Sequence, residues 1–182
     1  ARSMILITPD GERTMNTYLG ACVELSPEDI DADDVRASAI TYMEGYLWDP
    51  PAAKKAFLHA SEIAHKAGRR VSLTLSDSFC VDRYRSEFVS LLRDGIVDLL
   101  FANEHELKAL YETADLDTAI NAVREDCTLT ALTVGERGAM AISREETVHV
   151  PAAKVDDVVD LTGAGDLFAS GFMFGLSRNL GL

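Results

Sequence analysis

Apolar segments rich in β-branched residues alternate along this chain with amphipathic segments of helical period. Strand patterns fall at residues 39–45, 69–76, 96–103, 128–135, 138–143, 146–152 and 154–162. Helical patterns lie at residues 50–65, 81–94, 104–112 and 116–126, and a last apolar run begins near Gly163. This alternation predicts an α/β fold with a mostly parallel sheet and helices on both of its faces, because each helix returns the chain across the sheet.

The first 20 residues predict a different unit. Strand patterns at residues 3–8 and 12–19 flank the turn Pro9-Asp10-Gly11, and these three residue types are favoured in tight turns. Residues 1–20 are therefore expected to fold as a two-stranded antiparallel ribbon. After it, Ser26 and Pro27 suit the N-cap and the first position of a short helix.

Composition limits the class of protein. The 182 residues are 47% hydrophobic and carry a formal net charge of −13, which predicts one soluble domain whose main partner is neither nucleic acid nor an anionic membrane, since both carry phosphates. The three cysteines match neither a disulfide framework nor a zinc motif. No segment is apolar over the length of a membrane span. We expect a cytoplasmic monomer or homodimer that acts on a small molecule.

The stretch VVDLTGAGDLFASG, residues 158–171, carries the clearest chemical signal. If a helix begins near Gly163, the N–H groups of Gly163, Ala164, Gly165 and Asp166 lack partners inside the helix and, with the helix dipole, form an anion site. The Asp166 carboxylate is then placed to take a proton from an attacking hydroxyl, while the amides stabilise charge on a transferred group. The pattern indicates phosphoryl transfer.

Two common phosphate-binding motifs do not fit this stretch. The dinucleotide fingerprint fails because Phe168 stands where a third small residue is needed, and the P-loop fails because no GK[ST] sequence is present. A plainer interpretation stays open at this point, in which Gly163 and Gly165 only turn the chain and Asp166 is an exposed cap of the helix.

The same residues resemble the DTxGAGD signature of the PfkB, or ribokinase-like, family of carbohydrate and nucleoside kinases. Asp160, Thr162 and Gly163-Ala164-Gly165-Asp166 match, and the chain departs from the signature at Leu161. The resemblance implies a ribokinase-like fold with three αβα layers. It also implies ATP and Mg²⁺, with Asp166 as the base that activates the acceptor hydroxyl and the Gly163–Gly165 amides as the anion hole.

Two further segments resemble the family in the right order. ANEHE fits its NxxE motif, in which the acid acts on Mg²⁺ and the phosphates mainly through water; taken alone, Asn103 is an ordinary helix cap. TVGERG resembles its TxGxxG turn beside ATP; taken alone, it is a simple turn between strands. The resemblance implies a metal role for Glu106 and Asn103, and nucleotide contacts from Asn103, Glu106, Thr133, Gly135, Gly138 and Thr162.

The acceptor is predicted from looser similarity. The segments MNTYLGACVELSPEDI, EGYLWDPP and LTLSDSFCVDRYRSEF resemble adenosine kinase-like members more than ribokinases or fructokinases. We therefore expect transfer of the γ-phosphoryl group of ATP to a hydroxymethyl group of a nucleoside, with adenosine first and a sugar as the alternative. Asp77, just after the strand pattern at residues 69–76, is a candidate on the substrate or phosphate side.

The resemblance covers the middle and later part of a family member. Residues 1–182 are expected to form a single, partial ribokinase-like domain in which residues 1–20 are the lid ribbon. The family's N-terminal strand with a substrate-binding aspartate, and its last helices, are expected outside this sequence. If the protein is truly truncated, a non-catalytic nucleotide-binding module is the other alternative.

Overall fold

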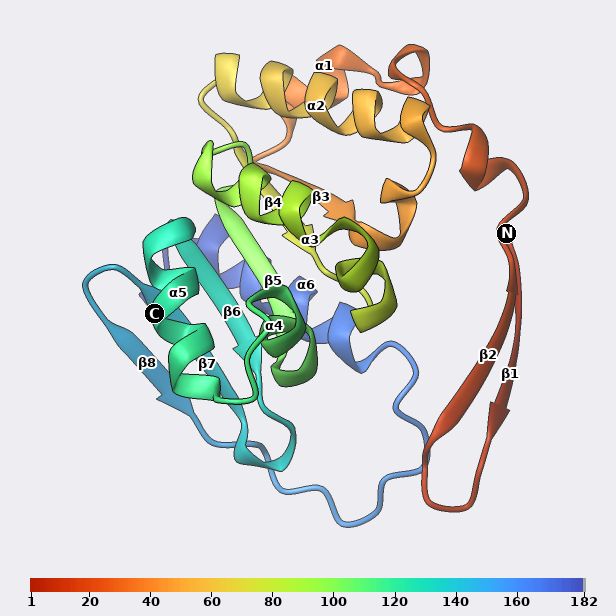
Figure 1. The fold of residues 1–182 in the computed structure, drawn as a ribbon, viewed down its shortest axis with the longest axis vertical. Coiled ribbons are helices and arrows are strands. Elements are labelled where there is room, and N and C mark those ends of the chain that lie inside the picture. Colours follow the sequence, from red (N-terminus) through yellow and green to blue (C-terminus); the bar gives the residue numbers. More distant parts are fainter. Residues whose placement is uncertain (182) are drawn as a thin grey trace.

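The structure, a computed structural model, describes residues 1–181 and is built around a six-stranded sheet (Figure 1). The strands lie side by side in the order of the sequence: β3 (Ile40–Glu44), β4 (Arg70–Thr74), β5 (Leu99–Asn103), β6 (Leu129–Thr133), β7 (Ala139–Ser143) and β8 (Thr147–Val150). Strands β3 to β6 are parallel, and β7 and β8 are antiparallel. The turn from β6 to β7 is too short for a parallel crossover. The expected mostly parallel sheet is confirmed.

Helices cover both faces of the sheet (Figure 1). One face packs against α2 (Pro51–Lys66), α3 (Ser78–Arg93), α4 (Glu104–Leu110) and α5 (Leu116–Asp126), and the other against α6 (Ala164–Ser177). Neighbouring residues of β5 show the division, because Leu100 joins the larger core while Leu99 and Phe101 pack toward α6. No helix within residues 1–181 is long and apolar enough to span a bilayer.

The first residues form the antiparallel ribbon, which stands apart from the sheet (Figure 1). Strand β1 (Arg2–Ile7) pairs with β2 (Arg13–Tyr18). Asp10 closes the turn between them, since its carboxylate accepts hydrogen bonds from the Thr8 hydroxyl at 2.5 Å and from the Glu12 N–H at 3.2 Å. The expected ribbon is confirmed, and its action as a lid stays a prediction.

One expectation about local structure is wrong and another is confirmed. Residues 154–162 form no strand: β8 ends at Val150, and Val155 and Val159 are exposed, 67% and 78%, with no neighbouring strand to pair with. The short helix expected after Ser26 is confirmed as the 3₁₀ helix Pro27–Asp29, with Ser26 at its N-cap and Pro27 at its start, and the α-helix α1 (Ala32–Ala37) follows it.

Candidate active site

The predicted site residues follow the carboxyl ends of the parallel strands, where open α/β sheets bind ligands. Strand β5 ends at Asn103 and β6 at Thr133, and these two residues lie opposite each other in the ladder. Asp77 follows β4 and precedes α3. The fold therefore brings the NxxE segment and the TxGxxG turn side by side.

The chain enters α6 through a left-handed turn at Gly163. Its φ of 77° and ψ of 4° are open to glycine and costly for residues with a Cβ. Just before it, the Asp160 carboxylate accepts a hydrogen bond from the Thr162 N–H at 2.8 Å, and the bonds from Thr162 lower the pKa of Asp160. One expectation is corrected here: the Ala164 N–H is not free, because it donates to the carbonyl oxygen of Leu161 at 3.2 Å.

The other amides of this turn remain open. Within the described chain, the N–H groups of Gly163, Gly165 and Asp166 donate to no protein acceptor. A Cβ added to Gly165 would meet no atom within 4 Å, and both Gly165 and Asp166 are exposed. First-turn N–H groups form the positive end of the helix dipole, so the turn presents accessible donors beside a carboxylate, and its role as an anion site stays a prediction.

An aromatic cluster fixes the start of α6 on the sheet. The Phe101 ring of β5 meets the Phe168 and Phe172 rings of α6 edge-on, with centroids 6.4 and 5.8 Å apart. Ala169, one position after Phe168, is buried against the same strand face. Such contacts restrain the orientation of the helix, and therefore the position of Asp166, which lies less than one turn before Phe168.

Glu44 belongs to this site although its sequence context did not single it out. It ends β3 and is half-buried; burial, and then the negative charge of Asp166, raise its pKa. The Ser76 hydroxyl lies 3.4 Å from Glu44 Oε2, and Ser76 has a φ of 69°, which is strained for a residue with a Cβ. Perturbed acids and backbone strain together are typical of functional sites. The signal available in the sequence was an acid at the end of a predicted strand.

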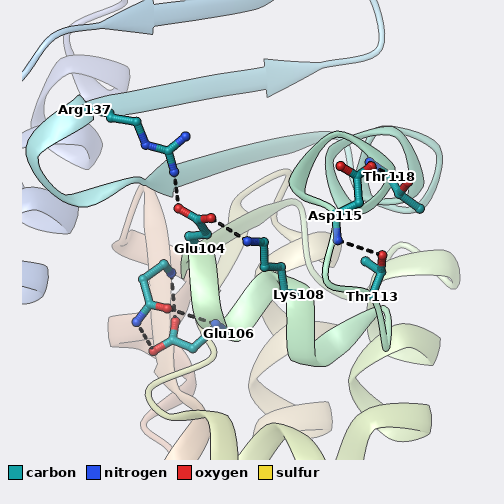
Figure 2. Close-up of polar contacts among 8 residues, drawn as sticks. Glu104, Glu106, Lys108, Thr113, Asp115, Thr118 and Arg137 are labelled. Atoms are coloured by element: carbon teal, nitrogen blue, oxygen red, sulfur yellow. Dashed lines mark hydrogen bonds and ion pairs between the residues drawn. The ribbon is translucent and has the colours of Figure 1, made fainter.

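Asn103 and Glu106 cap the N-terminus of α4 reciprocally, and Figure 2 shows Glu106 at this cap. The Asn103 N–H donates to Glu106 Oε2 at 2.9 Å, Asn103 Nδ2 donates to Oε1 at 2.8 Å, and the Glu106 N–H donates to Asn103 Oδ1 at 2.9 Å. Glu106 is only 7% exposed, and this burial raises its pKa. The helix cap is thus observed, and the metal role of the pair stays a prediction.

The turn that joins β6 to β7, residues Val134–Gly138, is tightly closed. The Val134 N–H donates to the Gly138 carbonyl oxygen at 2.9 Å. Gly138 has a φ of 102°, and a Cβ there would lie 2.0 Å from the carbonyl oxygen of Val150, so only glycine fits. Thr133 and Gly135 flank the start of the turn, and Gly135 is exposed.

The remaining candidate, Asp77, is used as a helix cap. Its carboxylate accepts the Cys80 N–H at 2.8 Å, and its charge contributes to the raised pKa of Glu106. No hydrogen bond or ion pair in the described part of the chain joins Asp166 to Asn103, Glu106 and Thr133, the residues predicted to meet the nucleotide. Residues 1–181 contain no group of three or more His, Cys, Asp or Glu side chains arranged to hold a metal ion.

The sheet, the helices on its two faces and the ribbon define a ribokinase-like α/β protein. The family model described as "pfkB family carbohydrate kinase" matches residues 1–182, so the chain belongs to this family. A curated relative, the aminoimidazole riboside kinase of Salmonella typhimurium, is 31% identical in an alignment of 182 positions that covers 96% of this chain and 56% of the relative.

Solved structures show the same fold. A probable sugar kinase from Rhizobium etli is 56% identical with a TM-score of 0.97, over 100% of this chain and 55% of that one. The adenosine kinase from Sinorhizobium meliloti is 57% identical with a TM-score of 0.95, over 97% of this chain and 54% of that one. A putative ribokinase II from E. coli, in complex with ATP and Mg²⁺, is 23% identical with a TM-score of 0.81, over 99% of this chain and 58% of that one. The chain spans about half the length of the relatives it matches.

Proposed function

We propose that this protein transfers the γ-phosphoryl group of ATP to a hydroxymethyl group of a nucleoside, with adenosine as the first candidate. One observation carries the proposal: Asp166 stands in the first turn of α6 beside the open amides of the Gly163 turn. A base next to an anion site suits the attack of a hydroxyl on phosphorus, because catalysis of this reaction consists mainly of positioning and electrostatic stabilisation. Family membership supports the same reaction class.

Each residue of the turn has a separate task in this proposal. Asp166 accepts the proton of the acceptor hydroxyl as that oxygen attacks. The N–H groups of Gly163 and Gly165 donate to oxygens of the group in transfer, where negative charge develops. ATP supplies the phosphoryl group, and the Mg²⁺ bound with it would neutralise part of the negative charge of the phosphates.

The second group of residues fits the nucleotide. Gly135 is exposed beside Thr133, and a Cβ on Gly135 would meet no atom within 4 Å, which leaves room for a ligand. Both carboxylate oxygens of Glu106 already accept hydrogen bonds from Asn103. Glu106 is therefore suited to act on Mg²⁺ through water, since Mg²⁺ bound to phosphates usually keeps several of its waters. Thr162 and Gly138 complete the proposed nucleotide contacts.

The acceptor class is proposed from two relatives. At 57% identity the Sinorhizobium protein is an adenosine kinase, and at 56% the Rhizobium protein is a probable sugar kinase. A free sugar is therefore the second candidate. Glu44 is the acceptor-side residue that we propose for either case, because its carboxylate lies near Asp166 and accepts hydrogen bonds of the kind that ribose hydroxyls donate.

The test is phosphoryl transfer by the full-length gene product. The protein is incubated with ATP, Mg²⁺ and adenosine, ribose or fructose in turn, and phosphorylated products are identified by mass spectrometry. We expect AMP from adenosine. A sugar phosphate without AMP would assign the sugar alternative, and ATP binding without product from any of these acceptors would contradict the proposal in favour of a non-catalytic module.

A further inference from the structure

One side-chain contact joins the two segments proposed to meet the nucleotide. Arg137, in the Val134–Gly138 turn, forms an ion pair with Glu104, the first residue of α4 (Figure 2). The ladder between β5 and β6 ends with the pair Asn103 and Thr133. Apart from the Arg137–Glu104 ion pair, no hydrogen bond or ion pair in the described chain connects the Val134–Gly138 turn to α4. Past the end of the ladder, Arg137 and Glu104 are therefore the side chains that link the two segments.

Glu104 is a fixed anchor for this contact. Its Oε1 accepts a hydrogen bond from Lys108 Nζ at 2.6 Å, while its Oε2 meets Arg137. The hydrogen bond from Lys108, followed by the positive charge of Arg137, lowers the pKa of Glu104. Its side chain is only 23% exposed, and an ionised acid suits the first turn of a helix. Each carboxylate oxygen of Glu104 thus contacts one cation, Oε1 that of Lys108 and Oε2 that of Arg137.

Arg137 is held from its other side as well. The Nε2 of His149, in β8, lies 2.8 Å from the carbonyl oxygen of Arg137, to which it donates. The backbone of the residue is thereby tied to the sheet while its side chain reaches α4. An isolated exposed ion pair contributes little to stability, but a pair that links two restrained segments fixes their separation.

We propose that Arg137 is a positioning residue that acts through Glu104. It sets the distance between the Val134–Gly138 turn and the capped start of α4, and thereby the affinity for ATP. This inference rests on the proposed nucleotide role of those segments. It predicts an effect on ATP alone, because Asp166 and Glu44 belong to a separate group of residues.

The experiment compares Arg137→Gln, Arg137→Lys, Glu104→Gln and the double variant R137Q/E104Q in the full-length gene product. Arg36→Gln is the matched control, because Arg36 is 56% exposed and Arg137 59%, and Arg36 also forms an ion pair, with Asp33. Three experiments are made: calorimetry for the Kd of ATP, steady-state kinetics for kcat and the KM values of ATP and acceptor, and amide hydrogen exchange of residues 134–138 without ligand.

We expect Arg137→Gln and Glu104→Gln each to weaken ATP binding about fivefold, the size of one partly buried ion-pair link. The double variant should be no weaker than either single variant, since both remove the same contact. Arg137→Lys should restore most of the affinity. The turn amides should exchange faster in both Gln variants, while the acceptor KM and kcat stay near the wild-type values.

Two results would overturn the inference. If the Arg137 and Glu104 variants match Arg36→Gln in amide exchange and in ATP affinity, the Arg137–Glu104 contact is an ordinary surface ion pair. Loss of affinity with Arg137→Gln but not with Glu104→Gln would mean that Arg137 touches the nucleotide itself. A wild-type protein that binds no ATP contradicts the proposed function instead, and the exchange rates then decide alone whether Arg137 orders the turn.

Discussion

Glu44 and Asp166 place two carboxylates near each other, one from the carboxyl end of β3 and one from the first turn of α6. Burial raises the pKa of Glu44, and the negative charge of Asp166 raises it further. A nearby like charge disfavours ionisation of a carboxyl group. The folded state therefore holds Glu44 in an environment that opposes its charge, as functional sites often do.

Glu44→Gln should stabilise the fold at neutral pH. Because the pKa of Glu44 in the folded state is raised above the usual value of a glutamic acid, the folded state binds more protons than the unfolded state between the two pKa values, and stability falls as pH rises through that range. The amide does not titrate, so its Tm should exceed that of the wild type near pH 7, and the difference should shrink below about pH 4.5.

Thermal unfolding between about pH 4 and pH 8 measures this difference. Glu125→Gln, which replaces an exposed acid of α5, is the control for the loss of one surface charge. If Glu44 also contacts the acceptor, the more stable variant should have the higher acceptor KM. A Tm difference that does not change with pH would contradict the account of Glu44.

Asn103→Ala should cost more stability than loss of an ordinary helix cap. It removes the acceptor for the Glu106 N–H and the donor to Glu106 Oε1, and so leaves a buried carboxylate short of partners. We expect a loss of about 2 kcal/mol in the free energy of unfolding, where an exposed cap is worth about 1 kcal/mol.

Asp115→Ala is the matched comparison, since Asp115 caps α5 by accepting the Thr118 N–H at 2.9 Å and is exposed. Urea unfolding of both variants gives the two losses. Equal losses in the free energy of unfolding would show that the hydrogen bond from Asn103 to the buried Glu106 carboxylate adds no stability beyond that of an ordinary helix cap.

The two glycines of the proposed anion site should respond in opposite ways to substitution by alanine. Gly163→Ala forces a Cβ into the left-handed region and should cost about 1 kcal/mol. Gly165→Ala, in the helix and with open space for a Cβ, should stabilise by about 0.5 kcal/mol. Its methyl group nevertheless obstructs the open amides, so kcat/KM should fall at least about tenfold. Full activity of Gly165→Ala would show that the phosphoryl group does not approach these amides.

Features set by a few neighbouring residues were predictable from the sequence. The ribbon turn follows from Pro9-Asp10-Gly11, the start of α4 from Asn103, and the entry to α6 from Gly163, and the structure shows all three. Each depends on backbone conformations or hydrogen bonds that span at most four residues. Local chemistry was sufficient for them.

Features that need segments far apart in the chain were not predictable in this way. The approach of Glu44 to Asp166, and the ion pair of Arg137 with Glu104, depend on which strands become neighbours and on where α6 packs. The strand predicted at residues 154–162 is wrong for a related reason. Apolar residues such as Val155 and Val159 form a strand only when a neighbouring strand pairs with their backbone hydrogen-bonding groups.

The most direct test of the central claim is the turnover of Asp166→Asn with ATP and the preferred acceptor. Asp157→Asn, an exposed acid in the segment before the anion site, is the control. If Asp166 is the base, kcat should fall about 10³-fold in Asp166→Asn, with ATP affinity near the wild-type value and Asp157→Asn fully active. A kcat for Asp166→Asn comparable to that of the wild type would contradict the assignment of Asp166 and, with it, the proposed mechanism.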